Sequence, residues 1–247
     1  MNFIQAVAAA RRVPTVSTGI VTNGLHHHWD AGNASSYPGS GTTWTDLQGN
    51  NDLTIFGNPV YNSTSPAHFD LDRVGDYASS ISSWAQPSGA NFTVEAWMRM
   101  DGQGNYNQML VTSQDSANRA FILFNNRTLA TAGTRKAMVF ACWDSSGNNL
   151  GTNYSTQVIS LNTWYHVMAV RDGTTSYIYI NGTLNTTQSL TNTTWMAGSL
   201  IEIGRRNISS VPDYWHGDVA EVRFYDRGLN STEVTQNWNA TKTKFGY

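Results

Sequence analysis

The stretch that decides the predicted fold is WYHVMAVRDGTTSYIYINGTL, residues Trp164–Leu184. It contains two turn signals, Asp172-Gly173 and Asn181-Gly182, and a run of strand length separates them. Dipeptides of this kind favour the positive φ angles of tight two-residue hairpin turns. Strands joined by such short connections can only pair antiparallel. The stretch therefore predicts a three-stranded antiparallel meander.

The sequence on both sides of this stretch has the same character. In FTVEAWMRM, residues 92–100, Phe92 and Val94 fall on one face of a strand, while Thr93 and Glu95 fall on the other. This alternation predicts a strand with one buried face. Further runs rich in β-branched and aromatic residues are QMLVTSQ, AFILFNN, KAMVFACWD, SLIEIG and DVAEVRFYD. The pattern predicts an all-β protein with antiparallel sheets.

The two ends of the chain depart from this pattern. Near the C-terminus, GLNSTEVTQNWNA predicts one short helix, because Asn230 can cap its first turn and Glu233 can reach back to the cap. Residues 1–23 contain no acid, and we interpret them as an arm that docks on another protein, the alternative being an arm folded onto its own domain. A short helix ended by Pro14 would carry the docking residues, which are Phe3, Ile4, Val7, Arg11 and Arg12. Residues 24–247 are predicted to form one domain.

The composition excludes several classes of partner. Charged residues make up 13% of the 247 residues and the formal net charge is -2, so no strong field attracts nucleic acid or an anionic membrane. No apolar run approaches the roughly 20 residues of a membrane helix, so membrane insertion is not expected. Arg11 and Arg12 follow the N-terminal apolar stretch, whereas a secretory signal has its basic residues first. Cys142 is the single cysteine, which excludes an internal disulfide, and its apolar strand predicts a buried, inert thiol.

Five segments in order resemble one known family. They are LHHHWDAGNASSYPGSGTTWTDLQGNNDLTIFG, HFDLDRVGDYA, FTVEAWMRM, NTWYHVMAVRDGTTSYIYINGTL and GDVAEVRFYDRGLNSTEV. Together they resemble the laminin-G-like and pentraxin-like branch of the concanavalin A-like jelly rolls. The resemblance implies an antiparallel two-sheet jelly-roll sandwich. The opening DAGN…YPGSGTTW and the closing TQNWNATKTKFGY are in addition similar to structural proteins of tailed-phage virions.

The resemblance implies three alternative functions. The first is a non-enzymatic protein of the virion surface, either a capsid decoration or a tail or fibre component. It would be made in the host cytoplasm, dock on other virion proteins and form a homo-oligomer. The second is a calcium-dependent, lectin-like adhesin that binds host or environmental glycans. The third is a glycoside hydrolase, which we disfavour because none of the four glutamates lies two or four residues from another acid along a strand. Acids that converge from different strands remain open.

Calcium is the cofactor that the resemblance implies. HFDLDRVGDY, residues 68–77, offers Asp70, Asp72 and Asp76, and it resembles an FDG-x-x-DY segment near which family members bind calcium. Carboxylate oxygens are the ligands that this ion prefers. Leu71 and Asp72 replace the glycine-containing step of the family, however. The alternative is that these acids cap turns.

GLHHHWDAGN, residues 24–33, contains three consecutive histidines. On a regular strand, His26, His28 and Asp30 share one face, with the two histidines roughly 6.6 Å apart. That spacing suits one zinc or nickel ion. One alternative is an ordinary strand with histidines that pack or face solvent. Another is a pH-sensitive contact across the axis of a homo-oligomer.

Aromatic residues make up 12% of the chain and include nine tryptophans. Exposed aromatic side chains in a sandwich can stack on sugar rings or anchor a protein partner, and otherwise they close the ends of the core. Four tryptophans lie in polar, loop-like sequence, namely Trp44, Trp84, Trp195 and Trp215.

Overall fold

The structure is a computed structural model that describes most of the predicted domain. The described residues are 19–83, 91–102, 107–114, 119–126, 137–144, 146–192, 200–207 and 213–247. The predicted docking residues of the arm lie outside them, and they are Phe3, Ile4, Val7, Arg11 and Arg12.

The predicted meander is present. Strands β12 (Trp164–Asp172), β13 (Thr175–Ile180) and β14 (Thr183–Ser189) pair antiparallel in sequence order. Their turns have the expected positive φ angles, 57° at Gly173, 51° at Asn181 and 74° at Gly182. The turn dipeptides therefore set the local chain reversals, as predicted.

The described residues form two large antiparallel sheets, each of eight strands. In sheet A the order is β14, β13, β12, β7 (Phe92–Met100), β18 (His216–Tyr225), β5 (His68–Asp72) and β4 (Val60–Asn62), and β1 (Leu25–Asp30) also pairs with β18. In sheet B the order is β11 (Asn149–Val158), β10 (Ala137–Trp143), β9 (Arg119–Asn126), β8 (Gln108–Gln114), β15 (Leu200–Ile203), β6 (Tyr77–Ser83), β3 (Leu53–Phe56) and β2 (Thr43–Trp44). A small ribbon pairs β16 (Arg205–Arg206) with β17 (Asp213–Tyr214).

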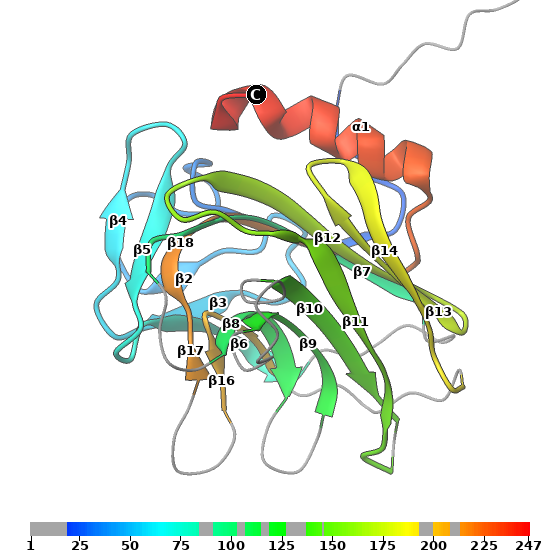
Figure 1. Ribbon diagram of the computed structural model, residues 1–247. Helices are drawn as coiled ribbons and strands as arrows, with labels where there is room; N and C mark the ends of the chain where they lie inside the picture. Colours follow the sequence, from blue (N-terminus) through cyan, green and yellow to red (C-terminus); the bar gives the residue numbers. More distant parts are fainter. Residues whose placement is uncertain are drawn as a thin grey trace, which may run out of the picture.

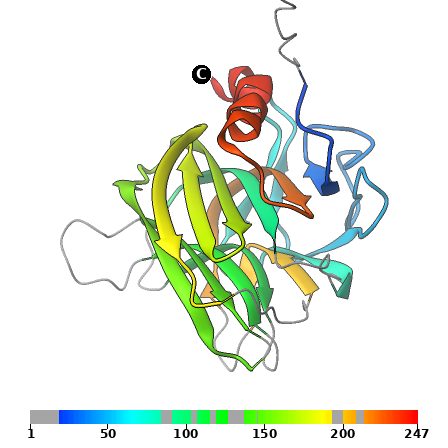
Figure 2. The ribbon, with the colours of Figure 1, turned by 90° about the vertical axis from the view of Figure 1, so that its right-hand side faces the viewer.

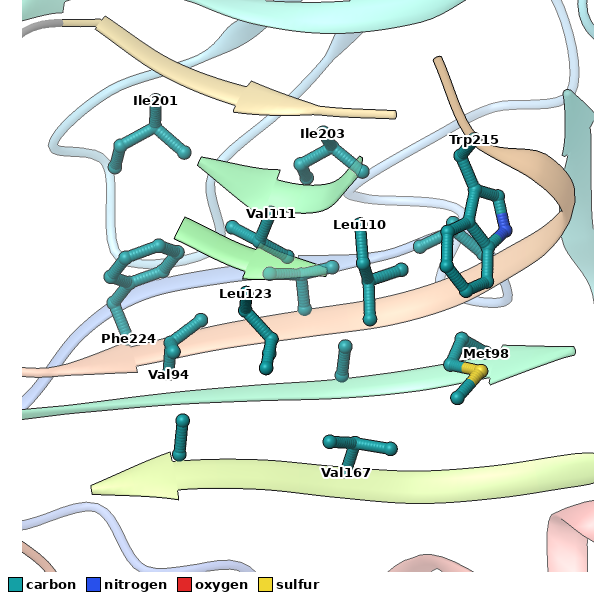
Figure 3. Close-up of a cluster of buried hydrophobic side chains, with 14 of the residues drawn as sticks. Val94, Met98, Leu110, Val111, Leu123, Val167, Ile201, Ile203, Trp215 and Phe224 are labelled. Atoms are coloured by element: carbon teal, nitrogen blue, oxygen red, sulfur yellow. The ribbon is translucent and has the colours of Figure 1, made fainter. Parts of the chain in front are cut away.

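The two sheets pack face to face around one large apolar core. Figure 3 shows side chains from both sheets meeting there, for example Val94 and Val167 from sheet A with Leu110 and Leu123 from sheet B. All four are fully buried. Alternating residues of each strand point into this layer, which is how a β-sandwich builds its core. The predicted antiparallel jelly-roll sandwich is confirmed.

The predicted C-terminal helix is confirmed with its cap. In α1 (Ser231–Thr241), the Asn230 side chain accepts from the Glu233 amide and the Glu233 side chain accepts from the Asn230 amide. A short 3-10 helix, Lys242–Phe245, follows. Figures 1 and 2 show α1 lying across the outer face of sheet A.

This helix changes the environment of β7. The alternation predicted one exposed face, but Glu95 and Trp97, on that face, are also buried. The Trp97 ring stacks on Phe245 with centroids 3.8 Å apart and on Trp238 at 5.3 Å. The prediction of a half-buried strand was wrong because α1 and the residues after it cover the outer face.

The described chain begins beside α1. The Gln236 side chain donates to the Gly19 carbonyl, and the Val21 amide donates to Asn237 Oδ1 at 2.8 Å. Val21 is buried in a small apolar cluster with Tyr225 and Val234. Val21 thus packs on the domain, although the sequence interpretation placed it in the arm. Within the described residues, neither helix has the length and apolar character that crossing a membrane requires.

Candidate functional site

The histidine run is held by a β-bulge in β1, where the register with β18 shifts between Leu25 and His27. His27 points into the domain, and its ring stacks on Trp29 with centroids 5.0 Å apart. Its Nδ1 lies 2.6 Å from Asp46 Oδ2. Burial raises the pKa of Asp46, but the hydrogen bonds from His27 and from backbone amides outweigh it and lower the pKa overall. His27 therefore supports the loop around Asp46.

The bulge separates the two histidines that were predicted to share a face. The His26 ring packs edge-on against His27 with centroids 4.4 Å apart, and burial lowers the pKa of His26. His28 Nε2 instead lies 2.7 Å from Glu221 Oε1 on β18. His28, Asp30 and Glu221 bring potential ligand atoms within 4.8 Å of one another. The structure thus groups His28 with acids rather than with His26.

Basic side chains already compensate this group. Arg223 is buried and pairs with both Glu221 and Glu95, and Lys244 Nζ lies 2.9 Å from Asp30 Oδ1. Burial raises the pKa of Glu221, but the nearby charge of Arg223 and the hydrogen bond with His28 outweigh it and lower the pKa to about 2. We call Glu95, Arg223 and Glu221 the buried ion-pair network. It attaches α1 to sheet A, because Asn237 Nδ2 donates to Glu95 Oε2 at 2.7 Å.

Two of the three predicted calcium ligands serve the turn between β5 and β6. Asp72 Oδ1 accepts from the Val74 amide at 2.6 Å. Asp76 Oδ1 accepts from the Asn58 amide at 2.7 Å, and its Oδ2 accepts from the Asp72 amide at 3.2 Å. Burial, with the neighbouring charge of Asp72, raises the pKa of Asp76 against these hydrogen bonds. These contacts are those of turn-capping acids.

The third predicted ligand, Asp70, belongs to a different group. Asp70 on β5 is the register partner of Asp218 on β18, and Asp101 follows the end of β7. The three carboxylates place one oxygen each within 4.8 Å of one another on the outer face of sheet A, and we call them the acidic cluster. Arg99 pairs with Asp218 and lies 3.4 Å from Asp101 Oδ1. Burial, with the charge of Asp101, raises the pKa of Asp218 to about 6 against the opposing effects of His68 and Arg99.

Sequence reasoning missed Asp101 and Asp218. They lie far from Asp70 in the sequence, and only the strand order of sheet A brings them together. No single strand carries two members of the cluster. The sequence left open that acids converge from different strands, and the acidic cluster is formed in this way.

An exposed aromatic group lies on the outer face of sheet B. The Phe56 ring stacks on Tyr77 with centroids 4.7 Å apart and an interplanar angle of 11°. The Arg205 guanidinium lies 3.6 Å from the centroid of the Tyr77 ring. The centroids of the Tyr77 and Tyr214 rings are 6.4 Å apart. Phe56 is 41% exposed. We call Phe56, Tyr77, Arg205 and Tyr214 the aromatic platform.

The four tryptophans in loop-like sequence are not among the residues of this platform. Trp44 and Trp215 are buried in the core, so they follow the alternative that such residues close its ends. Trp84 and Trp195 lie outside the described residues. Apart from the alternation typical of strands, no feature of the sequence indicated that Phe56 and Tyr77 form a surface site.

Residues 72–235 match the family model of the concanavalin A-like lectin/glucanases superfamily. The chain belongs to this superfamily. The match begins at the end of β5, ends within α1 and includes strands of both sheets. A comparison with curated proteins gave no match.

Solved structures similar to this superfamily domain include a Trypanosoma rangeli sialidase in complex with sialic acid, with a TM-score of 0.67 and 16% identity. The alignment covers 92% of this chain and 35% of the sialidase. The botulinum neurotoxin serotype G binding domain has a TM-score of 0.62 at 15% identity, covering 78% of this chain and 47% of that one. The serotype D binding domain has a TM-score of 0.64 at 13% identity, and the alignment covers 87% of this chain and 51% of that one. This chain thus spans about a third to a half of the similar chains, and the likeness shows the fold.

The single cysteine of this superfamily domain is buried on β10. Burial raises the pKa of the Cys142 thiol to about 12. Because the thiolate is the nucleophilic form, Cys142 is inert at neutral pH, as predicted.

Proposed function

We propose that this superfamily domain is a non-catalytic glycan-binding module and that the aromatic platform is its binding surface. The observation that carries the proposal is the Phe56 ring, which is 41% exposed while Tyr77 holds it in a stacked orientation. An aromatic ring held in this way can pack against the apolar face of a sugar ring without losing much side-chain freedom. Arg205 beside Tyr77 donates through Nε and Nη2 to Glu202, so its remaining N–H groups are the ones available to hydroxyl or carboxylate groups. The similar sialidase, solved with sialic acid, supports sialic acid among the first probes.

Binding without cleavage is supported by the state of the clustered acids. In the part of the chain that the structure describes, two groups bring acids close together, and both contact basic side chains. Arg223 and Lys244 contact the group of His28, Asp30 and Glu221, and Arg99 contacts the acidic cluster. Asp218 and Glu221 are also buried, which limits their contact with a glycan. We therefore expect no release of reducing sugar.

The test compares two exposed aromatic residues of sheet B. Wild type, Phe56→Ala and Tyr154→Ala would be screened on a glycan array, and hits would be titrated by calorimetry. Tyr154, on β11, is 39% exposed and is the matched control. We expect Phe56→Ala to weaken binding about tenfold, a loss of ~1.4 kcal/mol, with Tyr154→Ala unchanged.

Equal effects of the two variants, or an array with no hits, would contradict the proposed platform. Sugar release from polysaccharides by the wild-type protein would contradict the non-catalytic part of the proposal.

We further propose the surface of a tailed-phage virion as the setting, with a homo-oligomer docked on other virion proteins by the part of the arm that precedes Gly19. The similarity of the opening and closing segments to virion proteins supports this setting. Deletion of residues 1–18 should abolish co-sedimentation with particles, and persistent co-sedimentation would overturn the docking role.

A further inference from the structure

His68 lies at the edge of the acidic cluster. Its Nδ1 lies 2.6 Å from the Pro66 carbonyl oxygen. A carbonyl can only accept, so Nδ1 carries a hydrogen. The other ring nitrogen, Nε2, lies 3.3 Å from Asp218 Oδ1, at the edge of the cluster.

Two carboxylate oxygens of the cluster are buried without a hydrogen-bond partner, Oδ1 of Asp101 and Oδ1 of Asp218. The Asp218 side chain is only 1% exposed, so bulk water does not solvate it. Arg99 pairs with the other oxygen of Asp218 and approaches Asp101 only at 3.4 Å. A buried oxygen left in this state costs free energy, and its presence in a folded protein calls for a bound ion or water.

The acids of the cluster outnumber the basic side chains that contact them. Three carboxylates meet one guanidinium, that of Arg99, and one imidazole, that of His68. A divalent cation would balance the charge of the acidic cluster.

We propose that Asp70, Asp101 and Asp218 bind a divalent cation, calcium, on the outer face of sheet A. Oxygens bound to one calcium ion lie about 2.3–2.6 Å from it, so two of them are at most about 5 Å apart. The spacing within 4.8 Å meets this limit before any side chain moves. Three carboxylates form a hard oxygen donor set, which suits calcium.

This site differs from the calcium loop that the sequence suggested, since Asp72 and Asp76 cap the β5–β6 turn instead. It joins β5, β18 and the end of β7, so the ion would stabilise the sheet. It lies on sheet A and the aromatic platform on sheet B, so the inference stands independently of glycan binding. The competing account is a proton on His68, which would let Nε2 donate to Asp218 without any metal.

The experiment measures calcium binding to the full chain after treatment with a chelator and buffer exchange. Calcium chloride would be titrated by calorimetry, and the melting temperature would be recorded with and without the ion. Asp101→Asn and Asp218→Asn remove ligand charges from the cluster. Asp101, with a side chain 27% exposed, provides the variant with the smaller risk of misfolding. Asp72→Asn is the matched control, because it changes a neighbouring acid of β5 and an Asn side chain caps the same turn.

We expect one saturable calcium site per chain and a rise in melting temperature in wild type and Asp72→Asn. Both effects should be lost in Asp101→Asn and Asp218→Asn. Absence of binding and of any melting shift in wild type would overturn the proposal in favour of the proton on His68. Loss of binding in Asp72→Asn with retention in Asp101→Asn would also overturn it, and would place the ion at the turn.

Discussion

At the scale of single residues, Arg223 shows how the domain tolerates charge in its interior. It is buried between Glu95 and Glu221, and Glu95 also accepts a hydrogen bond from Asn237 of α1. A buried ion pair adds little net stability, because removing the charges from water offsets their attraction. Removing one partner is costly, since the remaining charges are left uncompensated. The network therefore specifies where α1 docks more than it adds stability.

The pH dependence of unfolding tests this role of Glu221. Its pKa falls from 4.5 to about 2 in the folded protein. A lowered carboxyl pKa contributes stability that is fully present above 4.5 and is lost as the pH falls toward 2. Glu221→Gln lacks this contribution and leaves Arg223 less compensated. We expect a free energy of unfolding about 3 kcal/mol below wild type at pH 7, with the difference narrowing between pH 4.5 and 2.

Urea denaturation across that pH range measures the difference. Asp226→Asn is the control, because it removes an exposed carboxylate at the end of the same strand. A difference between Glu221→Gln and wild type that stays constant with pH would contradict the assigned pKa.

At the scale of elements, the sequence predicted what depends on local chemistry. The turn dipeptides at Asp172-Gly173 and Asn181-Gly182 predicted the meander because the φ angles they favour close a hairpin without help from the rest of the chain. The cap at Asn230 predicted the start of α1 for the same reason. Both signals act within a few residues.

The elements that were misjudged depend on distant neighbours. The alternation in β7 is real, but the rings of Trp238 and Phe245 cover its outer face, so a strand predicted as half-buried is buried on both sides. A bulge in β1 moved His26 away from His28. A register shift of one residue changes which side chains share a face, and no turn dipeptide signals it.

At the scale of the whole molecule, strand order determines the candidate sites. Asp70, Asp101 and Asp218 meet because β5 and the end of β7 flank β18, and Phe56 meets Tyr77 because β3 pairs with β6. Strand order of this kind follows from the packing of the complete sandwich and not from any segment. The sequence therefore predicted the family of folds and one member of the acidic cluster, but neither site as a set of residues.

Contacts between distant parts of the chain also determine where the arm ends and the domain begins. The Val21 amide donates to Asn237 Oδ1 and the Tyr225 hydroxyl donates to the Val21 carbonyl, both in buried surroundings. Deletion of residues 1–23 would expose the apolar cluster around Val21 and remove the partners of Asn237 Oδ1 and of the Tyr225 hydroxyl hydrogen. We expect a loss of about 3 kcal/mol in the free energy of unfolding, from lost burial and unsatisfied hydrogen bonds together.

Deletion of residues 1–18 is the matched control for this experiment. If that segment contacts another protein, as the sequence predicts, its removal should leave the free energy of unfolding unchanged while Val21 keeps its contacts. Denaturant unfolding of the two truncated chains measures the difference. Equal stabilities would show that residues 19–23 add nothing to the domain, and the boundary would then return to residue 24. A loss already present in the shorter deletion would mean that the arm folds onto its own domain or onto another copy of this chain, because only these contacts can affect the stability of the purified protein.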